Sequence, residues 1–340
     1  MIDLRSDTFT KPTPEMLNAM MHAEVGDDVW DEDPTVKKLE TKAAEMFGLE
    51  AGLFCPSGTM TNQIALKVHT RPGDEIICHE YSHIYNYEGG GVAFNSGCQM
   101  KFTGGDRGLM SASSVEKCIN NPDDVHAART SLIVAENTCN KGGGSCYDLE
   151  TLTEIKAVAK QHKLPFHLDG ARLFNAITAK GYAPSDFGKL FDSISICLSK
   201  GLGAPVGSLI LGDKEFIREA KRVRKKFGGG MRQAGFLAAA GIYALDHNIQ
   251  RLEEDHHHAQ LLKEALLATD WVAKVDPVET NIVIFYLNNP EKEKEVINKL
   301  AEAGVNISGM GRGKLRMVTY YDIKPEHIKN ATNIIKQLKL

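Results

Sequence analysis

Helical and strand patterns alternate along the chain from about residue 36 to 212, and this alternation restricts the possible folds more than any other feature. Strands are predicted at residues 75–79, 131–135, 164–168, 193–198 and 208–211. Leu152, Ile155 and Ala159 recur at helical spacing, so a helix is predicted over 149–162 with Asp148 as its N-cap. Such alternation is typical of an α/β domain with a mainly parallel sheet.

The character of the sequence changes near Asp246. Beyond it we predict a charged amphipathic helix to about residue 269, a strand at 281–286, a helix at 291–303 and a strand at 314–319. We therefore predict a large α/β domain over residues 15–246. Residues 1–14 and 247–340 are expected to form a smaller α+β domain with an N-terminal arm.

Composition excludes several classes of protein. A net charge of −4 and a pI near 6.3 give no general attraction to nucleic acid or to anionic lipid. The uncharged stretch 233–245 is too short to cross a bilayer, and the N-terminus lacks the apolar segment of a secretory signal. The seven cysteines include no Cys-x-x-Cys pair, so reduced thiols are expected. We predict a soluble cytoplasmic protein that binds neither nucleic acid nor membranes.

Consecutive histidines at 256–258 lie on a predicted helix, where neighbouring side chains point away from one another. No metal site is predicted.

Lys200 follows the apolar strand pattern at 193–198 and precedes a turn that contains Gly201, Gly203 and Gly207. A lysine is ordinarily a solvated surface residue, but these glycines would let the backbone approach a flat ring closely. Asp169 follows the strand pattern at 164–168, so both residues would reach the same edge of a parallel sheet. An amine for a Schiff base and a carboxylate for a pyridinium nitrogen are two features of pyridoxal 5′-phosphate (PLP) sites.

Four further segments carry candidate residues. Gly58 and Thr59 open a helix pattern, where backbone N–H groups favour phosphate. Taken alone, this motif is more often an ordinary N-cap, and only the other candidate segments give the phosphate interpretation weight. Arg172 is a candidate for the phenolic oxygen of the ring or for a substrate carboxylate. His83 would stack on the ring or act as a general base, unless it is a core or capping histidine. Arg232, which follows three glycines, is a candidate phosphate contact.

Taken together, these segments resemble the low-specificity L-threonine aldolases, which are PLP enzymes of the aspartate-aminotransferase-like fold (fold type I). The resemblance runs nearly end to end. It rests on Asp3–Thr8, Gly26–Trp30, Pro56–Thr59, His79–His83, Glu136–Thr138, His167–Arg172, Leu198–Gly203, Gly229–Gln233 and Leu315–Thr319.

The resemblance implies retro-aldol cleavage of L-threonine, L-allo-threonine and related β-hydroxy-α-amino acids to glycine and an aldehyde. It assigns the Schiff base to Lys200, the pyridinium partner to Asp169, the phosphate to Gly58 and Thr59, and ring stacking and proton removal to His83. It also gives roles to residues that the patterns alone do not single out. Ser6, Arg172 and Arg316 would bind the substrate carboxylate, His126 would contact the β-hydroxyl, and Arg232 would enter a neighbouring subunit's site in a homotetramer built as a dimer of dimers.

Two positions depart from the family pattern, which often has histidine where this chain has Tyr320 and Cys139. If either lines the substrate site, rate or substrate preference would differ. The nearest alternative function is another PLP enzyme of this fold, a β-eliminating lyase or an aminotransferase, because the same cofactor residues serve all of them. A non-enzymatic nucleotide-binding protein is a distant alternative, since the chain has no Gly-x-Gly-x-x-Gly turn after its first strand and no Gly-Lys-Ser/Thr loop.

Overall fold

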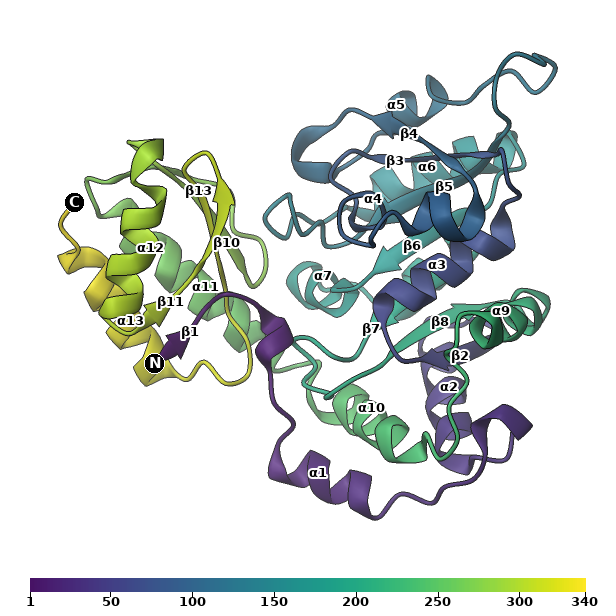
Figure 1. The fold of residues 1–340 in the computed structure, drawn as a ribbon, viewed down its shortest axis with the longest axis horizontal. Coiled ribbons are helices and arrows are strands. Elements are labelled where there is room, and N and C mark those ends of the chain that lie inside the picture. Colours follow the sequence, from purple (N-terminus) through teal and green to yellow (C-terminus); the bar gives the residue numbers. More distant parts are fainter.

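A seven-stranded sheet forms the centre of the larger part of the protein in a computed structural model that describes residues 1–340 (Figure 1). In spatial order its strands are Ala51–Cys55 (β2), Ser208–Gly212 (β8), Ser193–Cys197 (β7), Phe166–Gly170 (β6), Thr130–Glu136 (β5), Glu75–His79 (β3) and Gln99–Thr103 (β4). The strands from β7 to β4 are parallel, whereas β8 runs antiparallel to both β2 and β7. The predicted α/β fold with a mainly parallel sheet is confirmed.

Apolar side chains cover both faces of this sheet, as a parallel sheet requires. In β2, Leu53 and Cys55 pack on one face while Phe54 packs on the other, because side chains alternate along a strand. The first face is covered by α3 (Gly58–His69) and α9 (Lys214–Lys226). The second face is covered by α2 (Pro34–Phe47), α6 (Leu149–Gln161), α7 (Leu173–Lys180) and α10 (Gly235–His247).

Shorter elements connect these layers. They are α1 (Pro14–Met21), α4 (His83–Asn86), α5 (Ala112–Glu116), α8 (Pro184–Gly188), the π turn η3 (Val92–Ser96) and the 3-10 turns η1 (Asp7–Phe9), η2 (Asp28–Trp30) and η4 (Asp106–Gly108). Helix α1 lies alongside α10 (Figure 1). Asp148 caps α6 as predicted, since its Oδ1 accepts from Thr151 N at 2.8 Å.

The remaining elements form a smaller part with its own apolar core (Figure 1). They are α11 (Leu252–Leu267), β9 (Val272–Val275), β10 (Ile282–Leu287), the 3-10 turn η5 (Pro290–Lys292), α12 (Glu293–Glu302), β11 (Val305–Asn306), β12 (Ser308–Gly311), β13 (Lys314–Val318) and α13 (Pro325–Gln337). Strand β1 (Ile2–Asp3) pairs in parallel with β11, so the N-terminal arm starts in this part. The proposed division into residues 15–246 and 1–14 with 247–340 remains a prediction.

None of the helices combines the length and the apolar character that crossing a membrane requires. All seven cysteines are buried and free, in agreement with the prediction of reduced thiols.

Candidate active site

Asp169 lies on β6, one residue before the strand ends, with only 1% of its surface exposed. The strand begins at Phe166 and continues to Gly170, so the expectation that Asp169 follows a strand at 164–168 is corrected by two residues. Asn62 Nδ2 donates to Asp169 Oδ2 at 2.9 Å, and the N–H of Ala171 donates to Oδ1 at 3.2 Å. These donors fix a buried carboxylate at the carboxyl edge of the sheet.

Gly58 is the first residue of α3, as predicted. Ser57 is the N-cap, and its Oγ accepts from Met60 N at 3.2 Å, which leaves the N–H groups of Gly58 and Thr59 without a partner within the helix. A Cβ at position 58 would lie 2.5 Å from Cys197 Sγ, so only glycine fits. The start of α3 is therefore a close backbone cradle with free donors, which suits a phosphate group.

Lys200 follows β7 and begins a tight turn in which Gly203 N donates to Lys200 O at 2.8 Å. Its Nζ lies 3.6 Å from Cys197 Sγ. Gly203 has a φ of +82° and Gly207 a φ of +115°, and a Cβ at 207 would meet the Phe54 ring at 2.5 Å. In this structure these two glycines serve the turn and its packing. Their expected role of admitting a flat ring remains a prediction.

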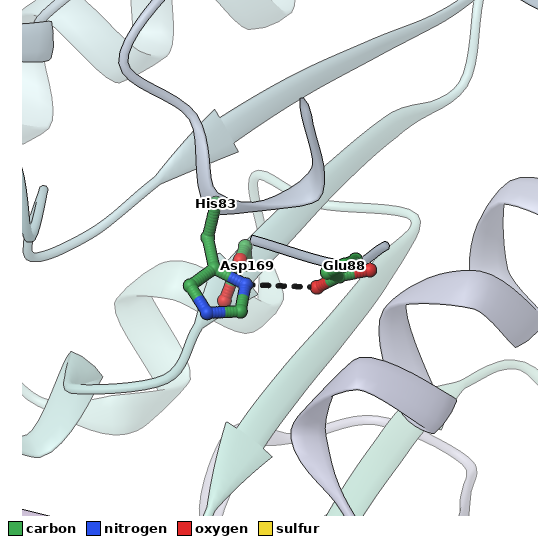
Figure 2. Close-up of side chains that lie close together, drawn as sticks. All are labelled: His83, Glu88 and Asp169. Atoms are coloured by element: carbon green, nitrogen blue, oxygen red, sulfur yellow. Dashed lines mark hydrogen bonds and ion pairs between the residues drawn. The ribbon is translucent and has the colours of Figure 1, made fainter. Parts of the chain in front are cut away.

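His83 opens α4, just beyond β3. Its backbone N–H donates to Glu136 Oε2 at 2.7 Å. Its Nδ1 lies 3.0 Å from Glu88 Oε1 (Figure 2). Because an ionised carboxylate only accepts, we assign the ring proton to Nδ1, which leaves Nε2 as the basic nitrogen. Burial would lower the pKa of His83, but the Glu88 hydrogen bond and the charge of Asp169 raise it above its ordinary value.

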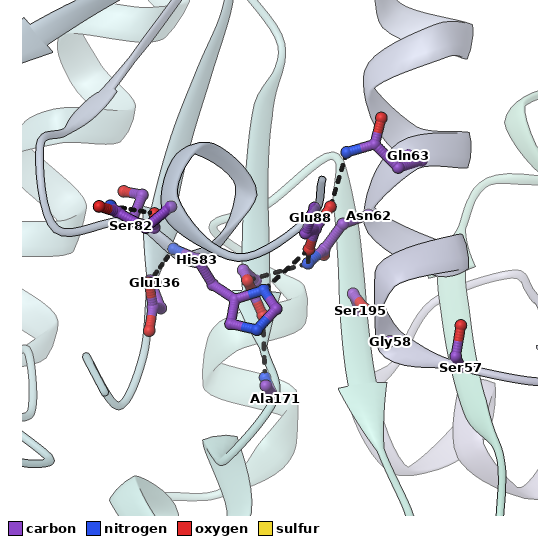
Figure 3. Close-up of polar contacts among 12 residues, drawn as sticks. Ser57, Gly58, Asn62, Gln63, Ser82, His83, Glu88, Glu136, Ala171 and Ser195 are labelled. Atoms are coloured by element: carbon purple, nitrogen blue, oxygen red, sulfur yellow. Dashed lines mark hydrogen bonds and ion pairs between the residues drawn. The ribbon is translucent and has the colours of Figure 1, made fainter. Parts of the chain in front are cut away.

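Glu88 joins these residues into one network, and the sequence reasoning did not identify it. Besides His83, it accepts from Asn62 Nδ2 at 2.9 Å and from Gln63 Nε2 at 2.6 Å (Figure 3). Nothing in the local sequence distinguishes this glutamate, because its partners come from α3. His83, Glu88 and Asp169 each offer a metal-binding atom, all within 4.8 Å of one another, yet Glu88 and Asp169 already accept from protein donors.

Glu136, at the end of β5, is a third buried carboxyl group in this network. Besides the His83 amide, it accepts from Asn140 N at 2.9 Å. Burial first, and then the neighbouring Asp169 carboxylate, raise the pKa of Glu136 to about 7.

The three residues expected to bind a carboxylate come from distant segments. Ser6 lies on the N-terminal arm, Arg172 precedes α7, and Arg316 lies on β13. Arg316 donates through Nη1 to Asn140 Oδ1 at 2.9 Å and through Nη2 to Arg5 O at 3.0 Å, while its buried Nε has no partner. Burial first, and then the charge of Arg172, lower the pKa of Arg316 below its ordinary value.

A cavity of about 620 Å³ brings five of the predicted residues together: Lys200, His83, Arg172, Ser6 and Arg316. The other residues that line it are Thr8, Tyr87, Asn140, Lys141, Ser308, Gly309 and Met310. Because residues such as His83 and Lys200 come from the larger part and Arg316 comes from the smaller part, the cavity lies between the two parts of the chain. Its polar, cationic lining suits a small anionic molecule.

Five predicted site residues do not line this cavity: Gly58, Thr59, Asp169, His126 and Arg232. Asp169 nevertheless lies close to the lining residue His83, since their polar atoms are within 4.8 Å of each other. His126 is on an exposed turn where its N–H donates to Asp124, and the exposed Arg232 pairs with Asp27 at 2.8 Å. Neither lines the cavity of a single chain, so both roles remain predictions. Tyr320 and Cys139 are buried and also lie outside the cavity lining, which removes the reason to expect these substitutions to alter substrate contacts directly.

Comparison with known proteins identifies a consistent set of relatives. The family model described as "Beta-eliminating lyase" matches residues 3–290. The low specificity L-threonine aldolase of Escherichia coli (strain K12) is 41% identical, with 96% of each chain covered. Low-specificity L-threonine aldolase 1 of Arabidopsis thaliana is 40% identical over 100% of this chain and 96% of its own.

Solved structures share the fold. The Leishmania major threonine aldolase superimposes with a TM-score of 0.86 at 21% identity over 99% of each chain. A structure described as SPT with its PLP internal aldimine has a TM-score of 0.75 at 15% identity, covering 98% of this chain and 86% of that one. The predicted PLP-dependent transferase-like fold (fold type I) is confirmed.

Proposed function

This chain belongs to the beta-eliminating lyase family, among its low-specificity L-threonine aldolases, and from that membership we propose that it cleaves L-threonine, L-allo-threonine and related β-hydroxy-α-amino acids to glycine and an aldehyde. It is accordingly a carbon–carbon lyase. The observation that carries the proposal is the cavity itself, which brings Lys200 and the only histidine of its lining together with two arginines. An amino acid's carboxylate and β-hydroxyl group would both find a partner there.

PLP fits the residues at this edge of the sheet. The free N–H groups of Gly58 and Thr59 are suited to its phosphate, the buried Asp169 carboxylate to its ring nitrogen, and the Lys200 amine to its aldehyde. His83, which lies close to Asp169, is suited to stacking on the ring. When bound, PLP supplies an electron-withdrawing ring that takes up the electron pair of the bond that breaks.

The carboxylate-binding residues decide which bond breaks. Arg316, with its unpaired Nε, together with Arg172 and Ser6 would hold the substrate carboxylate and thereby fix rotation about Cα. The site then sets the orientation of the Cα–Cβ bond, and holding the breaking bond in the reactive orientation increases the rate of cleavage.

His83 is the proposed base. Its Nε2 accepts the β-hydroxyl proton as the Cα–Cβ bond breaks and the aldehyde C=O forms, while Glu88 stabilises the imidazolium through Nδ1. Glycine is complete once Cα has taken up a proton. The contact between His126 and the β-hydroxyl stays a prediction.

The test is the release of acetaldehyde from L-threonine and L-allo-threonine by purified protein, followed by a coupled reductase with and without PLP. We expect PLP-dependent acetaldehyde together with an equal amount of glycine. Lys200→Ala should abolish both the turnover and the PLP that borohydride fixes to the protein, whereas the exposed Lys189→Ala should change neither. Ammonia and 2-oxobutanoate in place of acetaldehyde would identify a β-eliminating lyase. A new amino acid, formed when a 2-oxo acid is added to accept the amino group, would identify an aminotransferase.

We also propose a cytoplasmic homotetramer, a dimer of dimers with shared sites. The free cysteines suit a reducing compartment. Arg232 does not line the cavity of its own chain, and 59% of its side chain is exposed, so it is free to reach a neighbouring subunit. The large exposed side chains of Trp30 and Phe94 also suit subunit contacts. Mixing Lys200→Ala with Arg232→Ala after partial unfolding should restore activity, because some hybrid sites combine an intact lysine and an intact arginine. If no activity returns although hybrids form, the shared site is wrong.

A further inference from the structure

Most of the Arg172 guanidinium is already bound within the protein. Its Nε donates to Asp7 Oδ2 and its Nη2 donates to Asp7 Oδ1, each at 2.7 Å. This is a bidentate pair, the geometry that fixes the plane of a guanidinium most firmly. Only Nη1 has no acceptor in the protein. Arg172 lines the cavity and Asp7 does not, so the Asp7 carboxylate binds the guanidinium without itself lining the cavity.

Asp7 is itself held on several sides. It is fully buried at the start of η1, and its backbone carbonyl accepts from Thr10 Oγ1 at 2.6 Å. Asn281 Nδ2 donates to Asp7 Oδ2 at 3.3 Å and to Thr319 O at 3.0 Å, so the carboxylate is tied to the smaller part of the chain. Burial would raise the pKa of Asp7, but the charge of Arg172 lowers it below its ordinary value. The charged form of the carboxylate is therefore favoured, and donors from both parts of the chain hold it in place.

We propose that Asp7 is a positioning residue that orients Arg172 so that its free Nη1 faces the substrate carboxylate. This inference rests on the proposed function. An alternative role for Asp7, which is merely to neutralise Arg172, makes the opposite prediction. Removing a neutralising charge would strengthen the binding of a carboxylate, whereas removing an orienting acceptor would weaken it.

The experiment is Asp7→Asn in the PLP-loaded protein, with glycine binding followed by the cofactor's absorbance. Asparagine offers one acceptor where the carboxylate offers two, so Arg172 loses its bidentate support. We expect the glycine affinity to fall at least tenfold, while the affinity for aminoethanol, an amine without a carboxylate, changes less than twofold. The KM for threonine should rise by a similar factor to the glycine Kd. An unchanged or increased glycine affinity would overturn the proposal.

Asp322→Asn is the matched control, because Asp322 also fastens the N-terminal arm, by accepting from Lys11 N at 3.2 Å, yet does not touch Arg172. It should leave both affinities unchanged. Should Asp7→Asn fail to fold, Asn281→Ala removes only one of the donors to the Asp7 carboxylate and leaves the pair with Arg172. A two- to fivefold selective loss of glycine affinity is then expected. Wild-type protein that releases no aldehyde would refute the proposed function. Active wild type with no selective loss in either variant would refute only the role of Asp7.

Discussion

Buried charged side chains bind the free edge of strand β2, and their contribution to the stability of the folded protein should depend on pH. Phe54 N donates to Glu40 Oε1 at 2.8 Å, and Phe54 O accepts from Arg224 Nη1 at 2.7 Å. Arg224 also pairs with Asp28 at 2.9 Å. Glu40 and Arg224 thus satisfy the N–H and C=O of Phe54, two groups that a terminal strand otherwise presents to other chains. Burial raises the pKa of Glu40 from 4.5 to about 7.

The direction of the effect follows from linkage. A carboxyl group whose pKa is higher in the folded state stabilises the fold fully below pH 4.5, and this contribution is lost as the pH rises to 7. The difference of about 2.5 pKa units corresponds to roughly 3 kcal/mol at about 1.4 kcal/mol for each unit. Because part of the Glu40 side chain reaches solvent, this value is an upper limit. Glu40→Gln keeps the acceptor for Phe54 and removes the charge.

Denaturant unfolding of wild type and Glu40→Gln at equal protein concentration, at pH 5 and pH 8, measures this effect. We expect the variant to be more stable at pH 8, by at most about 3 kcal/mol, and the advantage to shrink below about 1 kcal/mol at pH 5. The control is Glu45→Gln, an exposed position on the same helix, which should change stability by less than about 0.5 kcal/mol at both pH values. A difference between wild type and Glu40→Gln that does not change with pH would refute the reasoning.

Three further predictions concern the site. Gly58→Ala should lower PLP affinity at least tenfold in equilibrium dialysis, because its Cβ would meet Cys197 Sγ, and adding Cys197→Ala should recover part of the loss. Glu88→Gln should move the acidic limb of the kcat/KM profile to lower pH, because Glu88 raises the pKa of His83; an unmoved limb would exclude His83 as the base. His126→Phe should reduce kcat/KM for threonine at least tenfold and leave glycine binding intact, and unchanged kinetics would remove His126 from the site.

Much of the larger sheet could be predicted because its central strands are short apolar runs between turns. Strand β3 matches the predicted residues 75–79, and β7 and β8 differ from prediction by one residue each. Strand β2, Ala-Gly-Leu-Phe-Cys, was not predicted, because alanine and glycine weaken a strand pattern. The helix expected from Asp246 begins only at Leu252, since the buried Asn248 Nδ2 donates to Leu202 O at 2.7 Å and the chain turns there. No local pattern reveals that contact.

The candidate site shows the same division between local and long-range information. The position of Lys200 or Asp169 at the end of a strand can be read from the sequence, because strand direction and sheet edge determine it. The partners that orient the site residues cannot be read in this way: Asp7 and Arg172 are 165 residues apart, and Asn140 and Arg316 are 176 apart. Each arginine is held by an acceptor from a different segment, and each keeps one nitrogen without a protein partner, Nη1 of Arg172 and Nε of Arg316. If the two arginines bind the substrate carboxylate as proposed, its recognition depends on the relative placement of the N-terminal arm, the segment after β5, and β13. Substitutions far from the cavity in any of these segments should then alter substrate affinity before they alter cofactor binding.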